Sequence, residues 1–321
     1  MHTRQGAVFD AYAEGVSPSS DVVTIVGAGM AGAACAAVLR AAEVPFRLVE
    51  RGRAVGGRMA SPVLHGRRVD VGAGYFTVRD PEFATVVDRW DMAGSARPWT
   101  DTFGVLVPGE DPGTSSGPTR WATPDGLRSL VRALLDGIEV DHEDITELPE
   151  GDVVLAMPDP QAGRLTPVPD AVAYDPVIAV VLGFESLTLP FRDAAFVNEH
   201  PDIQFVADDG ARRGDGAPVL VAHTTPGCAR AHLQNPDSAV EPVVKALREV
   251  LGACAPIWTH AHRWSFGKPA DHHPSTFSII ESGGRTISFV GDQWSPTGPP
   301  RIESAWRSGT DLGRALAALR L

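Results

Sequence analysis

The sequence predicts an α/β fold of two domains, in which a domain with a parallel sheet is interrupted by an inserted, mainly antiparallel domain. Three observations predict it. A β-branched run over 22–26 leads into a glycine-rich turn and a small-residue helix over 33–42. Apolar strand-like segments resume far along the chain, over 137–140, 152–156 and 286–292. Between them, 174–184 reads as a strongly apolar strand of a different sheet, with further short extended segments after it.

The first element is the strand and turn that open the fold. Residues 27–32 read Gly-Ala-Gly-Met-Ala-Gly, a G-x-G-x-x-G turn between a strand and a helix. Gly27 allows the tight turn, Gly29 lets the backbone approach a pyrophosphate, and Gly32 lets the helix pack close to its strand. The start of the helix, at Met30 and Ala31, supplies N–H groups and a positive dipole end for phosphates. The turn predicts a Rossmann-like dinucleotide-binding domain.

The second strand ends in an acidic residue. The apolar run 46–49 is followed by Glu50, eighteen residues after Gly32, and then by Arg51. A carboxylate here can accept hydrogen bonds from both hydroxyls of a ribose, and its charge would repel a 2′-phosphate.

The next segment indicates which dinucleotide binds. Residues 55–59 read Val-Gly-Gly-Arg-Met. In flavoproteins with an extended FAD the chain passes under the middle of the cofactor here, so Gly57 would allow close approach and Arg58 would offset phosphate charge. The alternative is a flexible turn with a solvated arginine. An acid at the strand end followed by Gly-Gly-Arg resembles the FAD-dependent amine-oxidase superfamily, and FAD is the predicted cofactor.

Composition and charge limit the classes of partner and the compartment that the sequence favours. The 321 residues carry a net charge of −12, which argues against nucleic acid or an anionic membrane as the main partner. No apolar run is long enough to span a membrane. The three cysteines, Cys35, Cys228 and Cys254, are widely spaced, as is typical of a reducing compartment. Nothing near Cys228 or Cys254 supports covalent attachment of a flavin, and Cys35 is interpreted as packing. With a polar leader over 1–20, the expectation is a cytoplasmic protein.

The remaining elements follow from periodicity and turn residues. Expected helices cover 81–90, 124–135, 240–251 and 301–319. Expected strands include 63–64 and 67–71 around a turn at His65 and Gly66, then 205–206, 219–223 and 257–262. The stretch 109–118, rich in Gly, Pro, Ser and Asp, is expected to be an exposed loop.

The domain interpretation follows the two kinds of strand. A flexible leader covers 1–20. The FAD-binding domain is discontinuous, over 21–75, 120–160 and 285–321. The substrate domain covers 76–119 and 161–284. Val140, at the end of an expected strand of the FAD-binding domain, is a further cofactor-binding candidate.

The last parallel strand leads to a second candidate cofactor segment. Gly291 and Asp292 end it, where a carboxylate would approach a polyol chain. N–H groups at the start of the following helix, around Arg301, Ile302 and Glu303, would stabilise negative charge on a reduced flavin. The alternative is an ordinary strand–turn–helix with a capping aspartate.

Residues 70–77 form another candidate for close approach. They read Asp-Val-Gly-Ala-Gly-Tyr-Phe-Thr, so Gly72, Ala73 and Gly74 could pass a flavin ring while Tyr75 walls the substrate space. The alternative is a strand edge with core aromatics.

Histidines cluster in a late strand. Strand alternation places His260, His262 and Trp264 on one face. They could line an active site or be structural; a metal site is not predicted, because no clear carboxylate or cysteine ligands accompany them. Arg212, Arg213 and Lys268 could serve an anionic substrate, but solvated surface is favoured for each. The catalytic candidates are Tyr75, His262 and Trp264 as walls around the flavin, which itself carries out the chemistry.

Taken together, the motifs resemble a narrower family, the renalase-like flavoproteins of bacteria. The matching segments are 26–32, 55–59, 70–83, 152–158, 262–264, 291–292 and 301–306, and the similarity spans about 21–320. The resemblance implies non-covalent FAD and oxidation of isomeric dihydronicotinamide dinucleotides by hydride transfer to flavin N5, with O2 as acceptor and H2O2 as product. Two features depart from the family: Gly74 stands where a glutamine is usual, and 204–215 replaces a stretch beside the substrate.

Three other functions remain open from the sequence. The same flavin chemistry could act on an amine or a specialised metabolite. The protein could instead bind flavin as a redox-responsive partner without turnover, or be a dehydrogenase that uses only a nicotinamide cofactor.

Overall fold

The computed structural model describes residues 22–252 and 255–320. The expected leader over 1–20, and Cys254, lie outside the described residues. The described chain divides into two compact units, each of which is described by itself. The first unit holds 22–57, 131–173 and 269–320, and the second holds 58–130 and 174–268.

The first unit is built on a sheet of six strands in the order β15-β16-β9-β1-β2-β8. β1, β2, β9, β16 and β8 pair in parallel, and β15 adds an antiparallel edge. The strands are β1 (Val23–Val26), β2 (Phe46–Glu50), β8 (Asp141–His142), β9 (Asp152–Leu155), β15 (Ser278–Ser282) and β16 (Arg285–Phe289). The helices are α2 (Met30–Ala41), α5 (Asp159–Ala162) and α9 (Ile302–Ala318).

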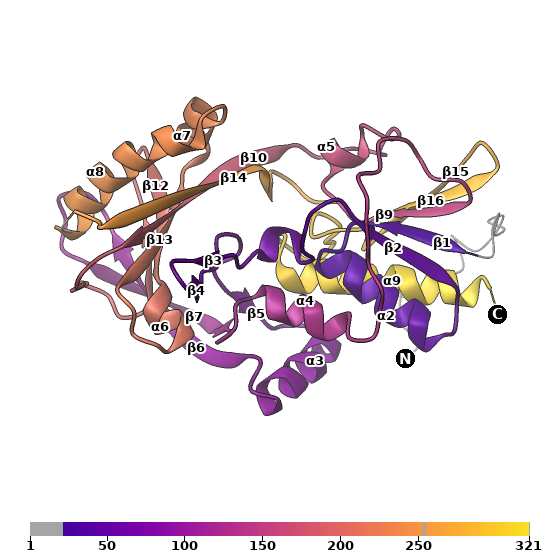
Figure 1. Cartoon of the computed structure of the whole chain (residues 1–321), viewed down its shortest axis with the longest axis horizontal. Coiled ribbons are helices and arrows are strands. Elements are labelled where there is room, and N and C mark those ends of the chain that lie inside the picture. Colours follow the sequence, from indigo (N-terminus) through magenta and orange to yellow (C-terminus); the bar gives the residue numbers. More distant parts are fainter. Residues whose placement is uncertain (1–21, 253–254, 321) are drawn as a thin grey trace. The chain divides into compact units, whose positions relative to one another are not determined.

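Helices α2 and α9 run side by side in this unit (Figure 1). Small residues let them approach closely, because a Cβ added to Gly309 would lie 1.9 Å from the carbonyl oxygen of Ala31. The whole of β1 is buried. An apolar cluster that includes Val153, Leu155 and Phe289 packs around the neighbouring strands. Burial on both sides explains why these strands are continuous apolar runs in the sequence.

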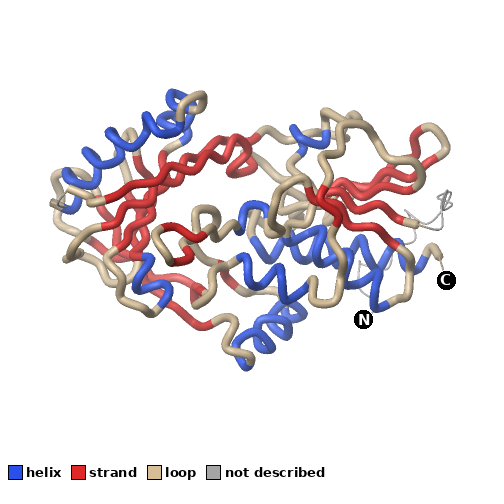
Figure 2. The backbone as a smooth tube through the Cα atoms, in the orientation of Figure 1, coloured by secondary structure: helices blue, strands red, loops and turns tan. Residues whose placement is uncertain are grey.

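The second unit contains a sheet of eight strands in the order β14-β10-β13-β12-β11-β6-β7-β5, in which β10 and β14 run beside each other (Figure 2). The strands are β5 (Phe76–Thr77), β6 (Arg97–Leu106), β7 (Gly113–Ala122), β10 (Tyr174–Gly183), β11 (Ala194–Val197), β12 (Ile203–Asp208), β13 (Val219–Thr224) and β14 (Trp258–Pro269). A separate hairpin pairs β3 (Val63–Leu64) with β4 (Arg67–Arg68). The helices are α3 (Pro81–Met92), α6 (Asp209–Arg213), α7 (Pro226–His232), η2 (Pro236–Ala239) and α8 (Val240–Leu251). The helical segments η1 (Gly57–Met59) and α4 (Arg128–Leu134) span unit boundaries.

Alternation along β10 separates the two faces of this sheet. Ile178, Val180 and Leu182 point to the face covered by α7 and α8. Ala179 and Val181 point to the opposite face, where Val71 and Trp264 pack against them. The second face is the one that carries the candidate substrate residues, as described below.

Most expected elements are confirmed, and three need correction. The expected loop over 109–118 is wrong in part, because β7 begins at Gly113 and pairs with β6; its polar residues reflect an exposed strand. The expected strand over 137–140 is wrong, since Gly137 has φ +71° and the pairing with β2 begins only at Asp141. The expected helix over 124–135 is shorter, as α4 covers Arg128–Leu134.

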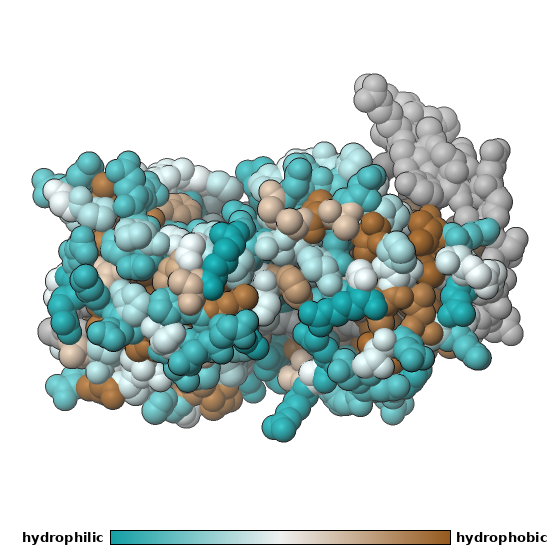
Figure 3. All heavy atoms as spheres, turned by 90° about the horizontal axis from the view of Figure 1, so that it is seen from above, coloured by the Kyte–Doolittle hydropathy of each residue, from teal (hydrophilic) through white to brown (hydrophobic). Residues whose placement is uncertain are grey.

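The surface is mainly polar in the view of Figure 3, with smaller apolar areas among hydrophilic side chains. No helix within the described residues is both long and apolar enough to cross a membrane.

Candidate functional site

The glycine turn after β1 has the geometry that its sequence predicts. Gly27 has φ +108°, and a Cβ there would lie 2.5 Å from the carbonyl oxygen of Ala156. A Cβ on Gly32 would lie 1.9 Å from the carbonyl oxygen of Gly27. Both glycines are therefore required by close backbone packing within the first unit, in agreement with the roles expected for them.

Gly29 differs from its two neighbours. A Cβ added there would have no atom within 4 Å, so the fold itself leaves this space open. Gly29 is also the N-cap of α2, where no side chain caps the helix and no acidic residue lies in the first turn. The N–H groups of this turn, at Met30 and Ala31, are therefore suited to an anion.

The Gly-Gly pair lies against the same turn. The Gly56 N–H donates to the carbonyl oxygen of Ala28 at 2.8 Å, and a Cβ on Gly57 would lie 3.6 Å from the Cα of Gly29. Their φ values are +111° and +49°, which favour glycine. Gly56 was not among the predicted cofactor-binding residues, although it belongs to the Gly-Gly-Arg motif that predicted its neighbours Gly57 and Arg58.

Glu50 is held in a fixed orientation at the end of β2. Its Oε2 accepts a hydrogen bond from the Ala28 N–H at 3.0 Å, and its Oε1 accepts one from the Gly52 N–H at 2.8 Å. Each carboxylate oxygen can accept a further hydrogen bond. The carboxylate is thus pre-oriented beside the glycine turn and retains capacity for a diol.

The end of β16 forms a second buried turn. The Gly291 N–H donates to Ser308 Oγ at 3.0 Å, and a Cβ on Gly291 would lie 2.1 Å from Gln293 Oε1. At the start of α9 the Arg301 N–H donates to Ser304 Oγ at 2.8 Å. The expectation of an available N–H at Arg301 is therefore wrong, because the helix caps itself there.

A buried polar cluster supports this turn and was missed by sequence reasoning. Asp159 accepts hydrogen bonds from Gln293 Nε2 at 2.8 Å and from the Val172 N–H at 2.9 Å, and its Oδ2 lies 2.8 Å from His273 Nε2. The His273 ring stacks on Trp294 with centroids 3.6 Å apart. The three polar side chains come from distant segments and share no sequence motif, so no local signal could have found them.

Gln293 has one unused acceptor. Its Nε2 contacts Asp159 and the carbonyl oxygen of Met157, both of which are acceptors, and this fixes the orientation of the amide. Its buried Oε1 has no hydrogen-bond partner among the described residues. A ligand hydroxyl that donates to this oxygen would satisfy it.

In the second unit, Arg212 and Arg213 contradict the expectation of solvated side chains. Arg212 is completely buried and Arg213 is 8% exposed. Arg212 forms an ion pair with Asp209, and Arg213 Nη2 lies 2.7 Å from Asp70 Oδ2. Buried guanidinium groups need such partners, so charge compensation explains their place. Lys268 is exposed, as expected.

Arg212 also holds the segment from Asp70 to Gly74 in place. Arg212 donates from Nη1 to the Gly74 carbonyl oxygen at 3.0 Å and from Nη2 to that of Asp70 at 3.3 Å. Burial opposes the charge on Asp209, but the nearby Arg212 and Arg213 outweigh it and lower the pKa of Asp209. The segment is therefore held by a compensated ionic network.

Gly72 and Gly74 have packing roles within the second unit. A Cβ on Gly72 would lie 1.8 Å from the carbonyl oxygen of Arg58, which also accepts the Ala73 N–H at 2.9 Å. A Cβ on Gly74 would lie 3.0 Å from the Phe205 ring. These contacts account for both glycines without a cofactor, and the expected approach to a flavin remains a prediction.

The candidate walls fall into two groups. Trp264 donates from Nε1 to the Val71 carbonyl oxygen at 2.7 Å, and its ring centroid lies 4.5 Å from that of His262. The ring centroids of His260 and His262 lie 6.5 Å apart. The prediction that His260, His262 and Trp264 share one face is therefore confirmed. Tyr75 instead packs edge-on against Phe103 at 5.2 Å.

Two histidines of this sheet are held neutral. Burial, together with His260 and Arg128, lowers the pKa of His262 to about 4. Burial and Arg212 lower the pKa of His223 to about 4 as well. His223 opposes Phe205 across β13 and β12, and the sequence gave no motif that pointed to it. At neutral pH both imidazoles can donate or accept hydrogen bonds without charge.

Comparison with known proteins agrees with this architecture. Residues 25–90 match the family model of the NAD(P)-binding Rossmann-like domain. A protein assigned as a protoporphyrinogen oxidase, from Exiguobacterium sp. 255-15, has a similar structure, with a TM-score of 0.72 and 14% identity over 94% of this chain and 100% of the other. The chain has the fold of a flavin amine oxidase-like protein.

Two further solved structures are similar to the chain. Cyclohexylamine oxidase from Brevibacterium oxydans IH-35A has a TM-score of 0.70 and 13% identity over 92% of this chain and 98% of the other. Putrescine oxidase bound to putrescine has a TM-score of 0.67 and 15% identity over 93% and 99% of the two chains. The glycine turn and Glu50 lie within the part that matches the Rossmann-like model.

The two cysteines within the described residues lie in different units: Cys35 in the first, hereafter called the Rossmann-like unit, and Cys228 in the second. Burial raises the pKa of Cys35 to about 12, so its thiol stays protonated and packs in α2. Burial and Asp202 raise the pKa of Cys228 to about 11, which disfavours a reactive thiolate. Within 22–252 and 255–320, no group of three or more His, Cys, Asp or Glu side chains could hold a metal ion.

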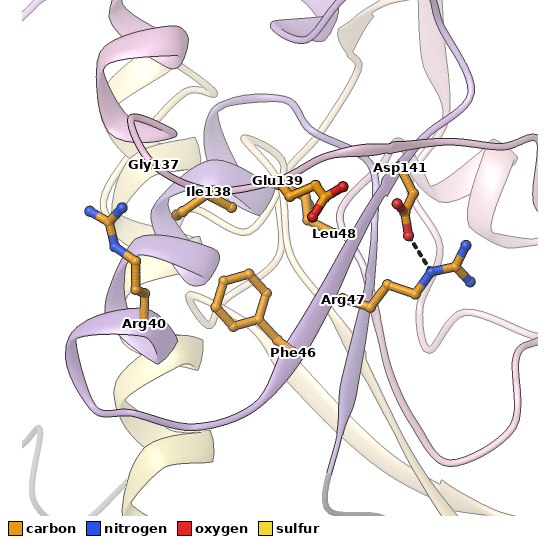
Figure 4. A pocket seen from close by; sticks show the side chains of 8 residues that line it. All are labelled: Arg40, Phe46, Arg47, Leu48, Gly137, Ile138, Glu139 and Asp141. Carbon is orange, nitrogen blue, oxygen red and sulfur yellow. Dashed lines mark hydrogen bonds and ion pairs between the residues drawn. The ribbon is translucent and has the colours of Figure 1, made fainter.

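A surface hollow of about 340 Å³ lies elsewhere on the Rossmann-like unit (Figure 4). Its lining includes Arg40, Phe46 and Ile138, and the ion pair between Arg47 and Asp141 borders it. The hollow adjoins the start of β2, whereas Glu50 stands at the end of that strand. Its lining includes neither Glu50 nor the glycine turn, but Glu139 and Asp141, on either side of the candidate Val140, belong to it.

Proposed function

We propose that the chain is an FAD-dependent oxidoreductase that binds FAD non-covalently through its Rossmann-like unit. One observation carries the proposal: the open space at Gly29, beside an uncapped helix N-terminus, lies next to the Glu50 carboxylate that the Ala28 N–H holds in place. The first feature suits a pyrophosphate and the second a ribose.

The residues of this unit fit the cofactor part by part. Met30 and Ala31 would donate backbone N–H groups to the phosphates, and Glu50 would accept the ribose hydroxyls. Gln293 Oε1, buried without a partner among the described residues, would accept a hydroxyl of the polyol chain near Gly291. The other proposed cofactor-binding residues of this unit are Gly27, Gly32, Arg51, Gly57, Val140, Asp292, Ile302 and Glu303.

Bound FAD would accept a hydride from a small-molecule donor and pass its electrons to O2, giving H2O2. The protein would bind and orient the donor and exclude water. In this proposal His262 and Trp264 line the donor site, with Tyr75 as a further wall. The neutral His262 would contact the donor through hydrogen bonds without placing a positive charge beside it.

The first candidate donors are isomeric dihydronicotinamide dinucleotides, as in the renalase-like flavoproteins that the sequence resembles. The block over 70–83 supports this choice, because it is the most specific part of the resemblance. The reacting ring of such a donor is uncharged and flat, which suits aromatic walls.

The second candidate donor is an amine or a specialised metabolite. The ion pairs of Arg212 with Asp209 and of Arg213 with Asp70 favour it. Because the charges of these arginines are already compensated, they are not available to the phosphates of a dinucleotide donor. An amine must be neutral to lose a hydride, so its oxidation would speed up as the pH rises. Oxidation of a dihydronicotinamide would depend on pH less.

Anaerobic rapid mixing tests these alternatives. Protein loaded with FAD and freed of excess cofactor is mixed with 2- and 6-dihydro-NAD isomers, and separately with a panel of amines. We expect fast loss of the oxidised-flavin absorbance with one class, and H2O2 when air is admitted. A protein that stays colourless with FAD would overturn the proposal, and a yellow protein reduced by neither class would favour a non-catalytic flavin-binding role.

A further inference from the structure

His142 lies beside the residue proposed to bind the ribose. It is the last residue of β8, and in the parallel pairing of β2 with β8 it stands opposite Glu50. Its side chain is exposed, whereas its backbone belongs to the Rossmann-like sheet. Ligands of such sheets bind outside the carboxyl ends of the strands, which is where His142 stands.

A chain of hydrogen bonds connects His142 to the carboxylate. His142 Nδ1 lies 2.7 Å from the Gly52 carbonyl oxygen, and the Gly52 N–H donates to Glu50 Oε1 at 2.8 Å. A carbonyl oxygen only accepts, so Nδ1 must carry the proton. His142 thus holds the turn that orients Glu50.

The same contact determines what the other ring nitrogen can do. In the neutral imidazole, a proton on Nδ1 leaves Nε2 as a hydrogen-bond acceptor. The exposed edge of His142 therefore presents an acceptor at the end of β8.

The order of the strands indicates what reaches this acceptor. Phosphates are expected at the start of α2, which follows β1, and the ribose at Glu50 on β2. β8 is the neighbour of β2 on the side away from β1. A dinucleotide that runs from phosphate to ribose along this edge brings its base to β8 next.

We propose that His142 is an adenosine-binding residue: its Nδ1–H positions Glu50 through Gly52, and its Nε2 accepts a hydrogen bond from the exocyclic amine of adenine. This inference rests on the proposed binding of an adenine dinucleotide. It assigns base recognition to a side chain that neither the glycine motif nor the resemblance indicates.

Two variants separate the two roles. In His142→Asn the amide nitrogen can replace Nδ1 as donor to Gly52, while the remaining acceptor, Oδ1, lies closer to the backbone than Nε2 and does not reach its position. In His142→Phe both contacts are lost while a ring remains. The matched control is His272→Asn, another exposed histidine of the same unit, whose charged neighbour is Asp271.

The measurement is calorimetric binding of ADP and of IDP, in which an oxygen replaces the exocyclic amine, with FAD as a third ligand. The wild type should prefer ADP to IDP by about threefold to tenfold, as expected for one hydrogen bond. His142→Asn should lose this preference, His142→Phe should also bind both ligands more weakly, and His272→Asn should match the wild type.

Two different failures can be told apart. If the wild type binds neither ADP nor FAD, the proposed function itself is wrong. If it binds both but His142→Asn keeps the preference for ADP, the assignment of His142 is overturned while the cofactor proposal stands.

Discussion

Arg212 donates a hydrogen bond from Nη1 to the carbonyl oxygen of Gly74 at 3.0 Å. Gly74 and the 204–215 segment are the two places where the sequence departs from the renalase-like pattern, and this bond joins them. Phe205, from the same segment, occupies the space where a Gly74 side chain would stand. The two departures are therefore in direct contact, through the Arg212 hydrogen bond and the Phe205 ring.

The first prediction concerns the stability of this arrangement. Arg212→Met should lower the free energy of unfolding by about 3 to 5 kcal/mol, because it removes one positive charge from the buried network with Asp209 and Asp70 and breaks the hydrogen bonds to the Asp70 and Gly74 carbonyl oxygens. Arg67 and Arg213 still contact Asp209 in the variant. Chemical denaturation followed by fluorescence measures the change. Arg230→Met is the control: its pair with Asp175 is exposed, so the loss should stay within about 1 kcal/mol. Equal losses in the two variants would contradict a structural role for Arg212.

The second prediction separates cofactor binding from folding in the glycine turn. Gly29→Ser should fold with unchanged or higher stability, because its side chain enters open space at a favourable N-cap position. It should nevertheless weaken FAD binding by about tenfold or more, since the hydroxyl competes with the phosphates for the first-turn N–H groups. Flavin fluorescence titration and thermal unfolding give the two readouts.

The matched control for this variant is Gly32→Ser. Its Cβ would lie 1.9 Å from the Gly27 carbonyl oxygen, so it should destabilise the fold by more than about 2 kcal/mol. Unchanged FAD affinity in Gly29→Ser would show that the open space at Gly29 does not receive the pyrophosphate.

The third prediction concerns pH. The pKa of His223 is about 4 in the folded protein, lowered from 6.5 by burial and Arg212. Between pH 4 and pH 6.5 the unfolded chain binds more protons at this histidine than the folded protein does. The contribution of the neutral His223 to the free energy of unfolding is therefore complete above pH 6.5 and is lost as the pH falls toward 4. The loss amounts to roughly 3 kcal/mol at most, from 1.36 kcal/mol per pKa unit.

His223→Gln should therefore flatten this part of the stability profile. Urea denaturation at a series of pH values, for the wild type and the variant, measures the slope. Parallel profiles would mean that His223 is protonated as easily in the folded protein as in the unfolded chain.

The Rossmann-like unit could be predicted because its signals are local. Gly27, Gly32 and Glu50 lie in one continuous βαβ segment, where each residue type follows from the turn or strand end it occupies. The helix expected over 240–251 is likewise confirmed, since its apolar spacing faces a single cluster.

The polar networks could not be predicted, because they join distant segments. Asp159 meets His273 and Gln293, which lie more than a hundred residues away, and no spacing rule connects them. The sequence predicts a solvated Arg212 even though Asp209 lies three residues before it. Only the fold buries this pair and brings Asp70, more than a hundred residues away, to within 3.8 Å of Arg212. The strand β7 was missed because an exposed strand of Gly, Ser and Thr has the composition of a loop.

The last prediction tests the candidate donor site through Trp264. Trp264→Phe keeps an aromatic wall beside His262 but removes the donor to the Val71 carbonyl oxygen, so stability should fall by about 1 kcal/mol. FAD affinity should stay within about twofold, because the proposed phosphate and ribose contacts lie in the other unit. The rate of anaerobic flavin reduction should change, since the orientation of the Trp264 ring depends on that hydrogen bond.

The matched control is Trp121→Phe, because the Trp121 ring stacks on Phe76 and lies away from His262. Equal reduction rates in the wild type and both variants would remove Trp264 from the donor site.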